Sequence, residues 1–183
     1  MKFLKISLVM GVFLMINACT PHKVTEYTKA QPPLKLEEYF NGPIKAWGII
    51  QDRKGRVTTR FDIKMEGSWE NGVGTLKEDF DYYGGNEGKT TKRVWTIYKV
   101  DDTHYKGEAS DIIGSATGEI AGNSVRWSYI MDIPVDNKTY RITLDDWMFL
   151  MNDDVLINRS YLKKFGITVA ELTLFMQKQK QEE

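Results

Sequence analysis

Apolar and polar residues alternate one by one in several separated stretches of this 183-residue chain. In residues 60–65, phenylalanine, isoleucine and methionine occupy every second position, and charged residues stand between them. Residues 125–133 and 170–176 have the same pattern. Successive side chains of a β-strand point to opposite faces, so each stretch predicts a strand with one buried and one exposed face.

Clusters of glycine, asparagine and aspartate between these stretches are typical of tight turns. The turn sequences are Arg53-Lys54-Gly55, Asn71-Gly72, Tyr83-Gly84-Gly85-Asn86, Gly122-Asn123, Asp136-Asn137 and Asn152-Asp153-Asp154. Together they predict about ten short strands. One short helical turn is expected in "LKLEEYFNGP", where residues 41–43 would end it.

An all-β fold with about ten consecutive antiparallel strands favours a closed up-and-down β-barrel, because closure removes exposed strand edges. A β-sandwich is the alternative. The outward positions carry charged residues, whereas a membrane-spanning barrel needs an apolar outer belt. We therefore predict a soluble barrel domain over residues 34–178, followed by a polar tail over residues 179–183.

The first residues of the chain predict a signal peptide. Lys2 and Lys5 precede an apolar run at residues 6–16, which is shorter than the about 20 residues that a membrane-spanning helix needs. Residues 16–19, Ile-Asn-Ala-Cys, resemble a bacterial lipobox. This resemblance implies cleavage after residue 18, a diacylglyceryl thioether on Cys19 and usually an acyl group such as palmitate on its amine. Two or more chains anchor a protein stably; the alternative is a secreted protein with a free thiol.

Residues 19–33 are interpreted as the lipidated cysteine and a flexible tether. The segment lacks apolar periodicity and ends in two prolines. Fully extended, residues 20–33 could span on the order of 45 Å. Thr20, in the place of an aspartate, favours the outer membrane, periplasmic side, over the inner membrane.

The charge balance excludes some partners. Removal of residues 1–18 takes away two of the 25 basic residues and none of the 25 acidic ones. A nearly neutral, mixed composition gives no electrostatic footprint for nucleic acid or for anionic lipid headgroups. We expect no nucleic-acid partner, and contact with a membrane through the lipid anchor.

No group of residues in the sequence predicts catalysis, so no enzyme, metal or cofactor is expected. His104 is the only histidine in the predicted domain and lies in a predicted hairpin turn, which leaves neither a base beside a nucleophile nor a set of zinc ligands. Glu78, Asp79 and Asp81 could in principle supply an acid/base pair. An esterase or a glycosidase is therefore a third alternative.

One aspartate and several aromatic residues are candidates for ligand binding. By parity, Asp146 falls on the apolar face of its strand, where a carboxylate needs a donor; Arg159 on the next strand is the expected partner. Three interpretations stay open: an ion pair that closes the barrel, a bulge that turns Asp146 outward, or a polar anchor at the end of a cavity. Inward-facing tryptophans would line or fill the barrel. The candidates lie on four separate predicted strands: Trp47, Trp95, Trp127 and Trp147.

Small residues mark one further predicted strand. Gly114, Ala116 and Gly118 would share a face with little side-chain bulk. This pattern leaves two interpretations open: room for a ligand, or close packing of the strand against its neighbour.

Several segments together resemble a known family over most of residues 34–178. They are "FNGPIKAWGIIQDRKG", "GTLKEDF", "RVW", "DIIGSATGEIAGNSVRWSY", "DDWMFLMNDDVLINRS" and "KFGITVAELTLFMQK". The family comprises bacterial lipoproteins catalogued as domain of unknown function 3833. This resemblance implies an envelope lipoprotein and brings no established activity. "FNGPIKAWG" is also similar to a lipocalin (calycin-like) opening, in which a tryptophan packs beneath an arginine of a late strand, here Trp47 and Arg159.

These features favour a non-catalytic barrel that binds or carries an apolar or amphipathic molecule, such as an envelope lipid. The alternative is a structural or assembly lipoprotein that acts through protein–protein contacts. An internal cavity of several hundred Å³ would favour the first function. A filled core with an exposed apolar patch would favour the second.

Overall fold

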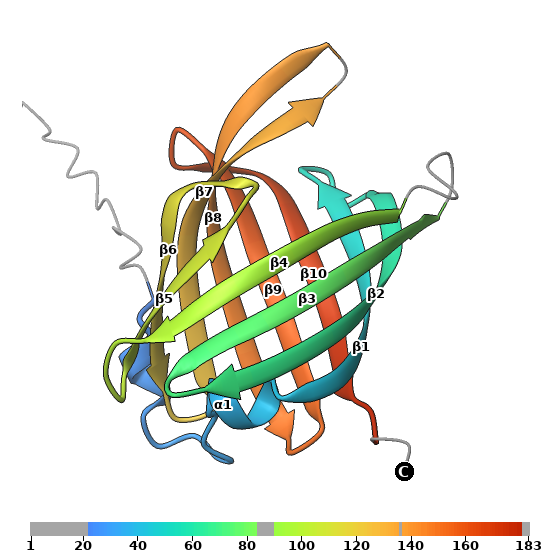
Figure 1. Ribbon diagram of the computed structural model, residues 1–183. Helices are drawn as coiled ribbons and strands as arrows, with labels where there is room; N and C mark the ends of the chain where they lie inside the picture. Colours follow the sequence, from blue (N-terminus) through green and yellow to red (C-terminus); the bar gives the residue numbers. More distant parts are fainter. Residues whose placement is uncertain (1–21, 84–89, 136, 181–183) are drawn as a thin grey trace, which may run out of the picture.

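The computed structural model describes residues 22–83, 90–135 and 137–180, which form one closed β-barrel (Figure 1). A 3-10 turn, η1 (Val24–Tyr27), and one helical turn, α1 (Leu36–Tyr39), precede the sheet. The strands are β1 (Gly42–Asp52), β2 (Val57–Glu70), β3 (Val73–Tyr83), β4 (Thr90–Lys99), β5 (His104–Ala109), β6 (Ile112–Ala121), β7 (Ser124–Val135), β8 (Lys138–Asn152), β9 (Val155–Lys164) and β10 (Ile167–Lys178). Within these ranges, no helix has the length and apolar character required to cross a membrane.

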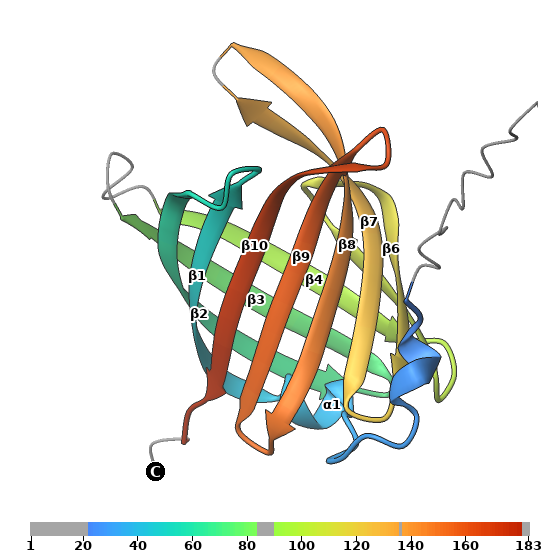
Figure 2. The ribbon, with the colours of Figure 1, turned by 180° about the vertical axis from the view of Figure 1, so that it is seen from behind.

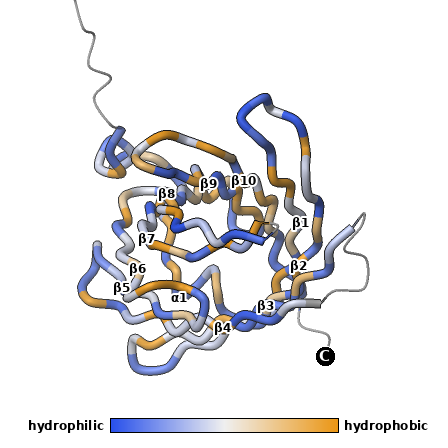
Figure 3. Tube along the Cα trace, turned by 90° about the horizontal axis from the view of Figure 1, so that it is seen from above, coloured by the Kyte–Doolittle hydropathy of each residue, from blue (hydrophilic) through white to orange (hydrophobic). Residues whose placement is uncertain are grey.

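Each strand pairs antiparallel with its neighbours in the sequence, and β1 pairs with β10 to close the sheet. Seen along the barrel axis, the strands form a ring (Figure 3). The predicted all-β up-and-down barrel is therefore confirmed, and the sandwich alternative is wrong. The short helical turn is also confirmed, as α1.

Alternating residues of the strands fill the barrel. In β2, Phe61, Ile63 and Met65 are buried, and the residues between them reach solvent. In β7, Val125 and Trp127 are buried in the same way. Each large apolar side chain that is removed from water contributes about 1.5–3 kcal/mol, so the alternation along the chain stabilises one face of each strand against the interior.

Helix α1 covers one end of the barrel, which we call the α1 end. Leu36 and Phe40 are buried, the Tyr39 hydroxyl donates to the Met176 carbonyl at 3.1 Å, and the Trp69 indole donates to the Phe40 carbonyl at 3.0 Å. The β2–β3, β4–β5, β6–β7 and β8–β9 turns lie at this end. The β1–β2, β5–β6, β7–β8 and β9–β10 turns lie at the opposite end, which we call the far end (Figures 1 and 2).

The segment before α1 packs against the outside of the barrel (Figure 2). Val24 is only 1% exposed, and the Leu34 amide donates to the Gly122 carbonyl at 2.8 Å. The prediction of a flexible tether is therefore wrong for residues 22–33. Val24 near the start of this segment and Leu34 directly after it are both buried, which holds the segment on the barrel. Residues 1–21, with Cys19, lie outside the described residues.

The small-residue strand β6 is closely packed. A Cβ atom at Gly118 would lie 2.8 Å from the Trp127 ring. On β5, a Cβ at Gly107 would lie 3.3 Å from both the Trp127 and the Trp95 ring. The glycines thus make room for two indoles, as the packing interpretation states. Gly114 has a positive φ of 73° and lies in a break of register between β6 and β7.

Two turns share an unusual backbone conformation. Asn71 and Gly72, which join β2 to β3, have φ angles of 51° and 79°, and Phe165 and Gly166, which join β9 to β10, have 52° and 78°. Two-residue hairpin turns with positive φ at both positions favour Asn-Gly. The first turn is therefore readable from its residues. The second was missed, because phenylalanine is an uncommon residue in this conformation.

Candidate functional site

The barrel contains a cavity of ≈ 100 Å³ that is mostly apolar. Side chains of α1 and of strands on all sides line it, including Leu36, Ile97 and Leu174. Three ionisable side chains also reach it: Glu78, Arg93 and Asp146. The cavity is smaller than the roughly 300–1,000 Å³ typical of sites for drug-sized ligands.

Strand register brings Glu78 and Arg93 together. They face each other across β3 and β4, and directly opposite residues of an antiparallel pair share a face. The Arg93 Nη1 atom lies 3.8 Å from Glu78 Oε2. The Arg93 Nη2 and Nε atoms also donate to Asp111 Oδ2, at 2.5 Å and 2.9 Å. One guanidinium thus serves two carboxylates, one from the cavity and one from the β5–β6 turn.

Asp146 is held by neutral donors. Its Oδ1 accepts hydrogen bonds from the Asn158 amide and from the Ser160 hydroxyl, both on β9. Arg159, the expected partner, instead donates to Glu171 at 2.5 Å on the outside of the barrel. That pairing was wrong because neighbouring residues of a strand point to opposite faces: residues 158 and 160 face inward, so Arg159 faces outward.

Burial dominates the ionisation of both carboxyl groups in the cavity. It raises the pKa of Glu78 to about 7; Arg93 lowers this pKa, and the carboxylates of Asp111 and Asp146 raise it further. Burial also raises the pKa of Asp146, against the hydrogen bonds from Ser160 and Asn158. The interior therefore holds two carboxyl groups that can gain or lose a proton nearer to neutral pH than exposed ones do.

Glu78 has an unsatisfied oxygen. Among the residues that the structure describes, its Oε2 is the buried side-chain polar atom that has no hydrogen-bond partner. Buried polar atoms in folded proteins nearly always have one, because an unpaired buried group costs the desolvation free energy without compensation. A hydrogen-bond donor at this position would therefore bind favourably.

The four candidate tryptophans divide into two pairs. Trp95 and Trp127 face inward and line the cavity. Trp47 lies on the outer face, 37% exposed, against Phe175. Trp147 is also on the outer face, so the inward orientation was wrong for both Trp47 and Trp147. The expected lipocalin-like pair, Trp47 packed beneath Arg159, is likewise wrong as part of the barrel interior, because both side chains lie on the outer face.

Trp147 is nevertheless buried, with 4% of its surface exposed. Its ring lies 4.3 Å, centroid to centroid, from the His22 ring and 6.2 Å from the Tyr27 ring. It borders an outer groove of ≈ 510 Å³, which His22 and Arg159 also line. The residues before α1 therefore cover this tryptophan.

Asp145 lies on the opposite face from Asp146, as their adjacency predicts. It borders the outer groove and pairs with Arg126 at 2.7 Å and with Lys163 at 2.5 Å. Burial alone would raise its pKa, but the two cations outweigh burial and lower it. This carboxylate is part of a surface ion-pair network.

The three carboxylates considered for acid/base chemistry do not all lie on the same face of strand β3. Asp79 and Asp81 face solvent, whereas Glu78 faces the cavity that Asp146 also reaches. The small cavity volume does not favour a glycosidase or an esterase. His104 is exposed and contacts Asp101 in the β4–β5 turn. Within residues 22–83, 90–135 and 137–180, no group of three or more His, Cys, Asp or Glu side chains could hold a metal ion.

Glu78, Arg93, Asn158 and Ser160 were not among the candidates for ligand binding. A signal for the first two was present. By alternation, Glu78 falls on the same strand face as Leu76 and Phe80. Arg93 falls on the same face of its strand as Trp95 and Ile97. The sequence thus placed one acidic and one basic residue on apolar faces.

Comparison with known proteins identifies the family. The family model described as "Protein of unknown function (DUF3833)" matches residues 13–178. The chain belongs to this family. The match to DUF3833 confirms the resemblance found in the sequence. A search of curated proteins gives no match to this DUF3833 chain.

Solved structures include a barrel that is similar to this DUF3833 protein. The S-type phycobiliprotein lyase CPES from Guillardia theta aligns with a TM-score of 0.57 and 9% sequence identity, over 88% of this chain and 100% of that chain. At this identity the likeness concerns the fold alone, and it supports the predicted closed up-and-down barrel.

Proposed function

We propose that this DUF3833 protein binds an apolar or amphipathic small molecule inside its barrel and does not transform it. The Oε2 atom of Glu78 carries this proposal: it lies in a cavity with apolar walls, 3.8 Å from Arg93 Nη1, and has no hydrogen-bond partner. A hydroxyl or amine of the ligand would donate to this oxygen, and the apolar part would lie against the aliphatic and aromatic lining. The barrel of the phycobiliprotein lyase supports a small-molecule role and leaves the ligand open.

The volume of the cavity limits the part of a ligand that fits. A cavity of ≈ 100 Å³ corresponds to about three water molecules, at about 30 Å³ each in the liquid. An engineered apolar cavity of about 150 Å³ binds benzene. The ligand would therefore place a short apolar segment and one donor group in this cavity.

The ligand can be identified and its position tested together. The protein is purified from the membrane of the cells that produce it, its bound small molecules are extracted, and the extract is analysed by mass spectrometry. Leu172→Trp adds bulk to the cavity, which Leu172 lines, and should reduce the co-purified ligand about tenfold. Thr173→Trp places the same side chain on the outer face of the same strand and should leave the ligand unchanged. Equal ligand in both variants, or none in the unaltered protein, contradicts the proposal.

We propose further that Cys19 carries acyl chains which hold the protein on the periplasmic side of the outer membrane. The supporting observation is the signal-like segment that ends in Ile16-Asn17-Ala18-Cys19. Cys19→Ser should move the protein from the membrane fraction to the soluble fraction in high salt. If the serine variant stays in the membrane fraction, this anchor is wrong.

The small cavity also favours a second candidate function. A barrel that is largely filled by its own side chains can act as an envelope assembly protein that docks onto a protein partner. In that case no small molecule should co-purify, and crosslinking in the membrane should capture a defined protein instead.

A further inference from the structure

An apolar side chain at the far end is unusually exposed. Phe165, in the β9–β10 turn, is 93% exposed, and the neighbouring Ile167 is 58% exposed. Turn chemistry does not account for this phenylalanine. The β2–β3 turn has nearly the same φ angles and uses Asn71, the residue type that such turns favour. At position 165 a disfavoured conformation thus holds a large apolar ring in solvent.

The β1–β2 turn lies beside this turn and is strongly basic. Strands β1 and β10 pair with Asp52 opposite Ala170, and residues 53 and 55 of the β1–β2 turn border one surface hollow together with Thr168 of β10, two residues beyond the β9–β10 turn. The β1–β2 turn carries Arg53, Lys54 and Arg56 and leads into Val57, which is 50% exposed. We define the far rim as residues 53–57 and 164–167.

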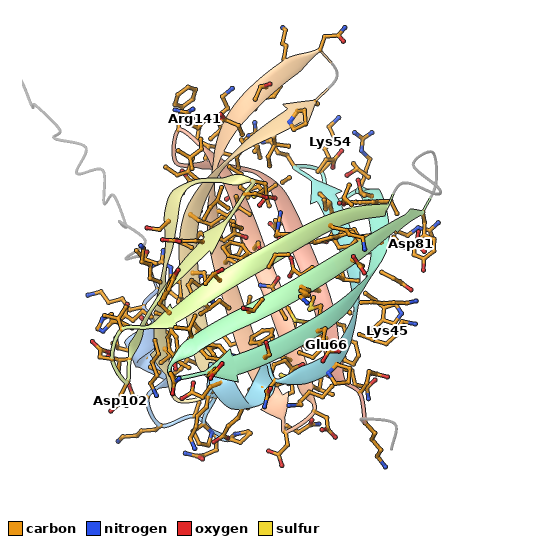
Figure 4. The ribbon with its side chains drawn as sticks, in the orientation of Figure 1. Lys45, Lys54, Glu66, Asp81, Asp102 and Arg141 are labelled. Carbon is orange, nitrogen blue, oxygen red and sulfur yellow. The ribbon has the colours of Figure 1, made fainter. Side chains whose placement is uncertain are left out.

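The far rim has an excess of positive charge. Arg56 pairs with Asp52 at 2.6 Å. In the part of the chain that the structure describes, Arg53, Lys54 and Lys164 form no ion pair. Figure 4 shows Lys54 at the far end, opposite to Asp102 at the α1 end. The nearly neutral composition conceals this excess, which arises from the placement of the charges, so the expectation of no footprint for anionic lipid headgroups does not hold for the far rim.

We propose that the far rim docks onto an anionic phospholipid surface, with Phe165 and Ile167 inserted at the headgroup boundary. Exposed apolar side chains flanked by cations fit this boundary, since the apolar part leaves water and the charges meet phosphates. The Lys164 ammonium lies 4.2 Å from the Tyr140 ring and 5.5 Å from the Phe165 ring, so a cation stands beside the exposed phenylalanine. This inference is independent of the ligand in the cavity and of the anchor at Cys19.

Vesicle flotation of a version that starts at Thr20 tests the far rim without the acyl chains. The closed sheet, α1 and the packed segment all lie within residues 22–180, so this version keeps every contact that positions the rim. It should bind phosphatidylcholine vesicles that contain about one-third phosphatidylglycerol, and bind pure phosphatidylcholine much more weakly.

Phe165→Asn should weaken this binding about tenfold, because the ring no longer leaves water. Lys54→Gln and Lys164→Gln should each weaken it about fivefold. Asparagine suits the turn, so the melting temperature of Phe165→Asn should stay equal or rise. Met151→Asn, at an apolar position of the α1 end that is 55% exposed, is the matched control and should bind as the unaltered protein does.

Three results would overturn the proposal: no binding to the anionic vesicles, equal binding to neutral and anionic vesicles, or an equal loss in Met151→Asn and Phe165→Asn. None of them bears on the ligand measured with Leu172→Trp. They are also separate from the fractionation of the Cys19→Ser protein.

Discussion

The change in unfolding free energy caused by Glu78→Gln is expected to be about 3 kcal/mol more stabilising at pH 8 than at pH 4. Burial raises the pKa of Glu78 from 4.5 to about 7 in the folded protein. Between these values the unfolded chain loses its proton while the folded chain keeps it, so the stability of the unaltered protein falls as the pH rises. Above about pH 7 both states are ionised, and the difference stays constant. Glutamine does not ionise, and it removes this dependence.

Urea unfolding at several pH values from 4 to 8 measures the effect as the difference between the two proteins. Other titrating groups contribute to both proteins and largely cancel in this difference. Asp79→Asn, on the exposed face of the same strand, serves as the matched control for the loss of one carboxylate from β3. If the difference in unfolding free energy between Glu78→Gln and the unaltered protein is the same at every pH, burial does not raise the pKa of the Glu78 carboxyl.

Trp147→Ala should cost about 3–5 kcal/mol of stability, whereas Trp47→Ala should cost less than about 1 kcal/mol. Both tryptophans lie on the outer face of the barrel. Trp147 is covered by His22 and Tyr27, and Trp47 is partly in solvent. The alanine at 147 removes an aromatic contact of both His22 and Tyr27, so the first described residues should also loosen from the barrel.

Thermal or urea unfolding gives the two free energies, and hydrogen exchange over residues 22–33 reports on the separation. Faster exchange in this segment is expected for Trp147→Ala and not for Trp47→Ala. Equal losses of stability in the two variants would show that the cover over Trp147 contributes nothing.

The alternation of residues was sufficient to predict the barrel, since a side-chain period of two and short turns leave few other ways to bury one face of every strand. Parity also placed Asp146 inside. The same rule, applied to Arg159, would have excluded it as the partner of Asp146, since Asn158 and Ser160 occupy the inward positions on either side of it.

Other features could not be read from the pattern. Trp147 is an outward residue that is buried by a segment more than 100 positions away in the sequence, and alternation along one strand contains no information on such a cover. The ion pair between Arg93 and Asp111 depends on how the β5–β6 turn brings Asp111 towards the barrel. The conformation of Phe165 is set by the two-residue link between its strands and not by its own preference.

The packing of residues 22–33 on the barrel wall shortens the connection to any anchor on Cys19. A chain of three residues reaches about 10 Å at most, compared with on the order of 45 Å for residues 20–33 fully extended. If Cys19 is acylated as proposed, the barrel cannot drift or tumble freely above the bilayer. Its few permitted orientations would determine which molecules in the headgroup layer it meets.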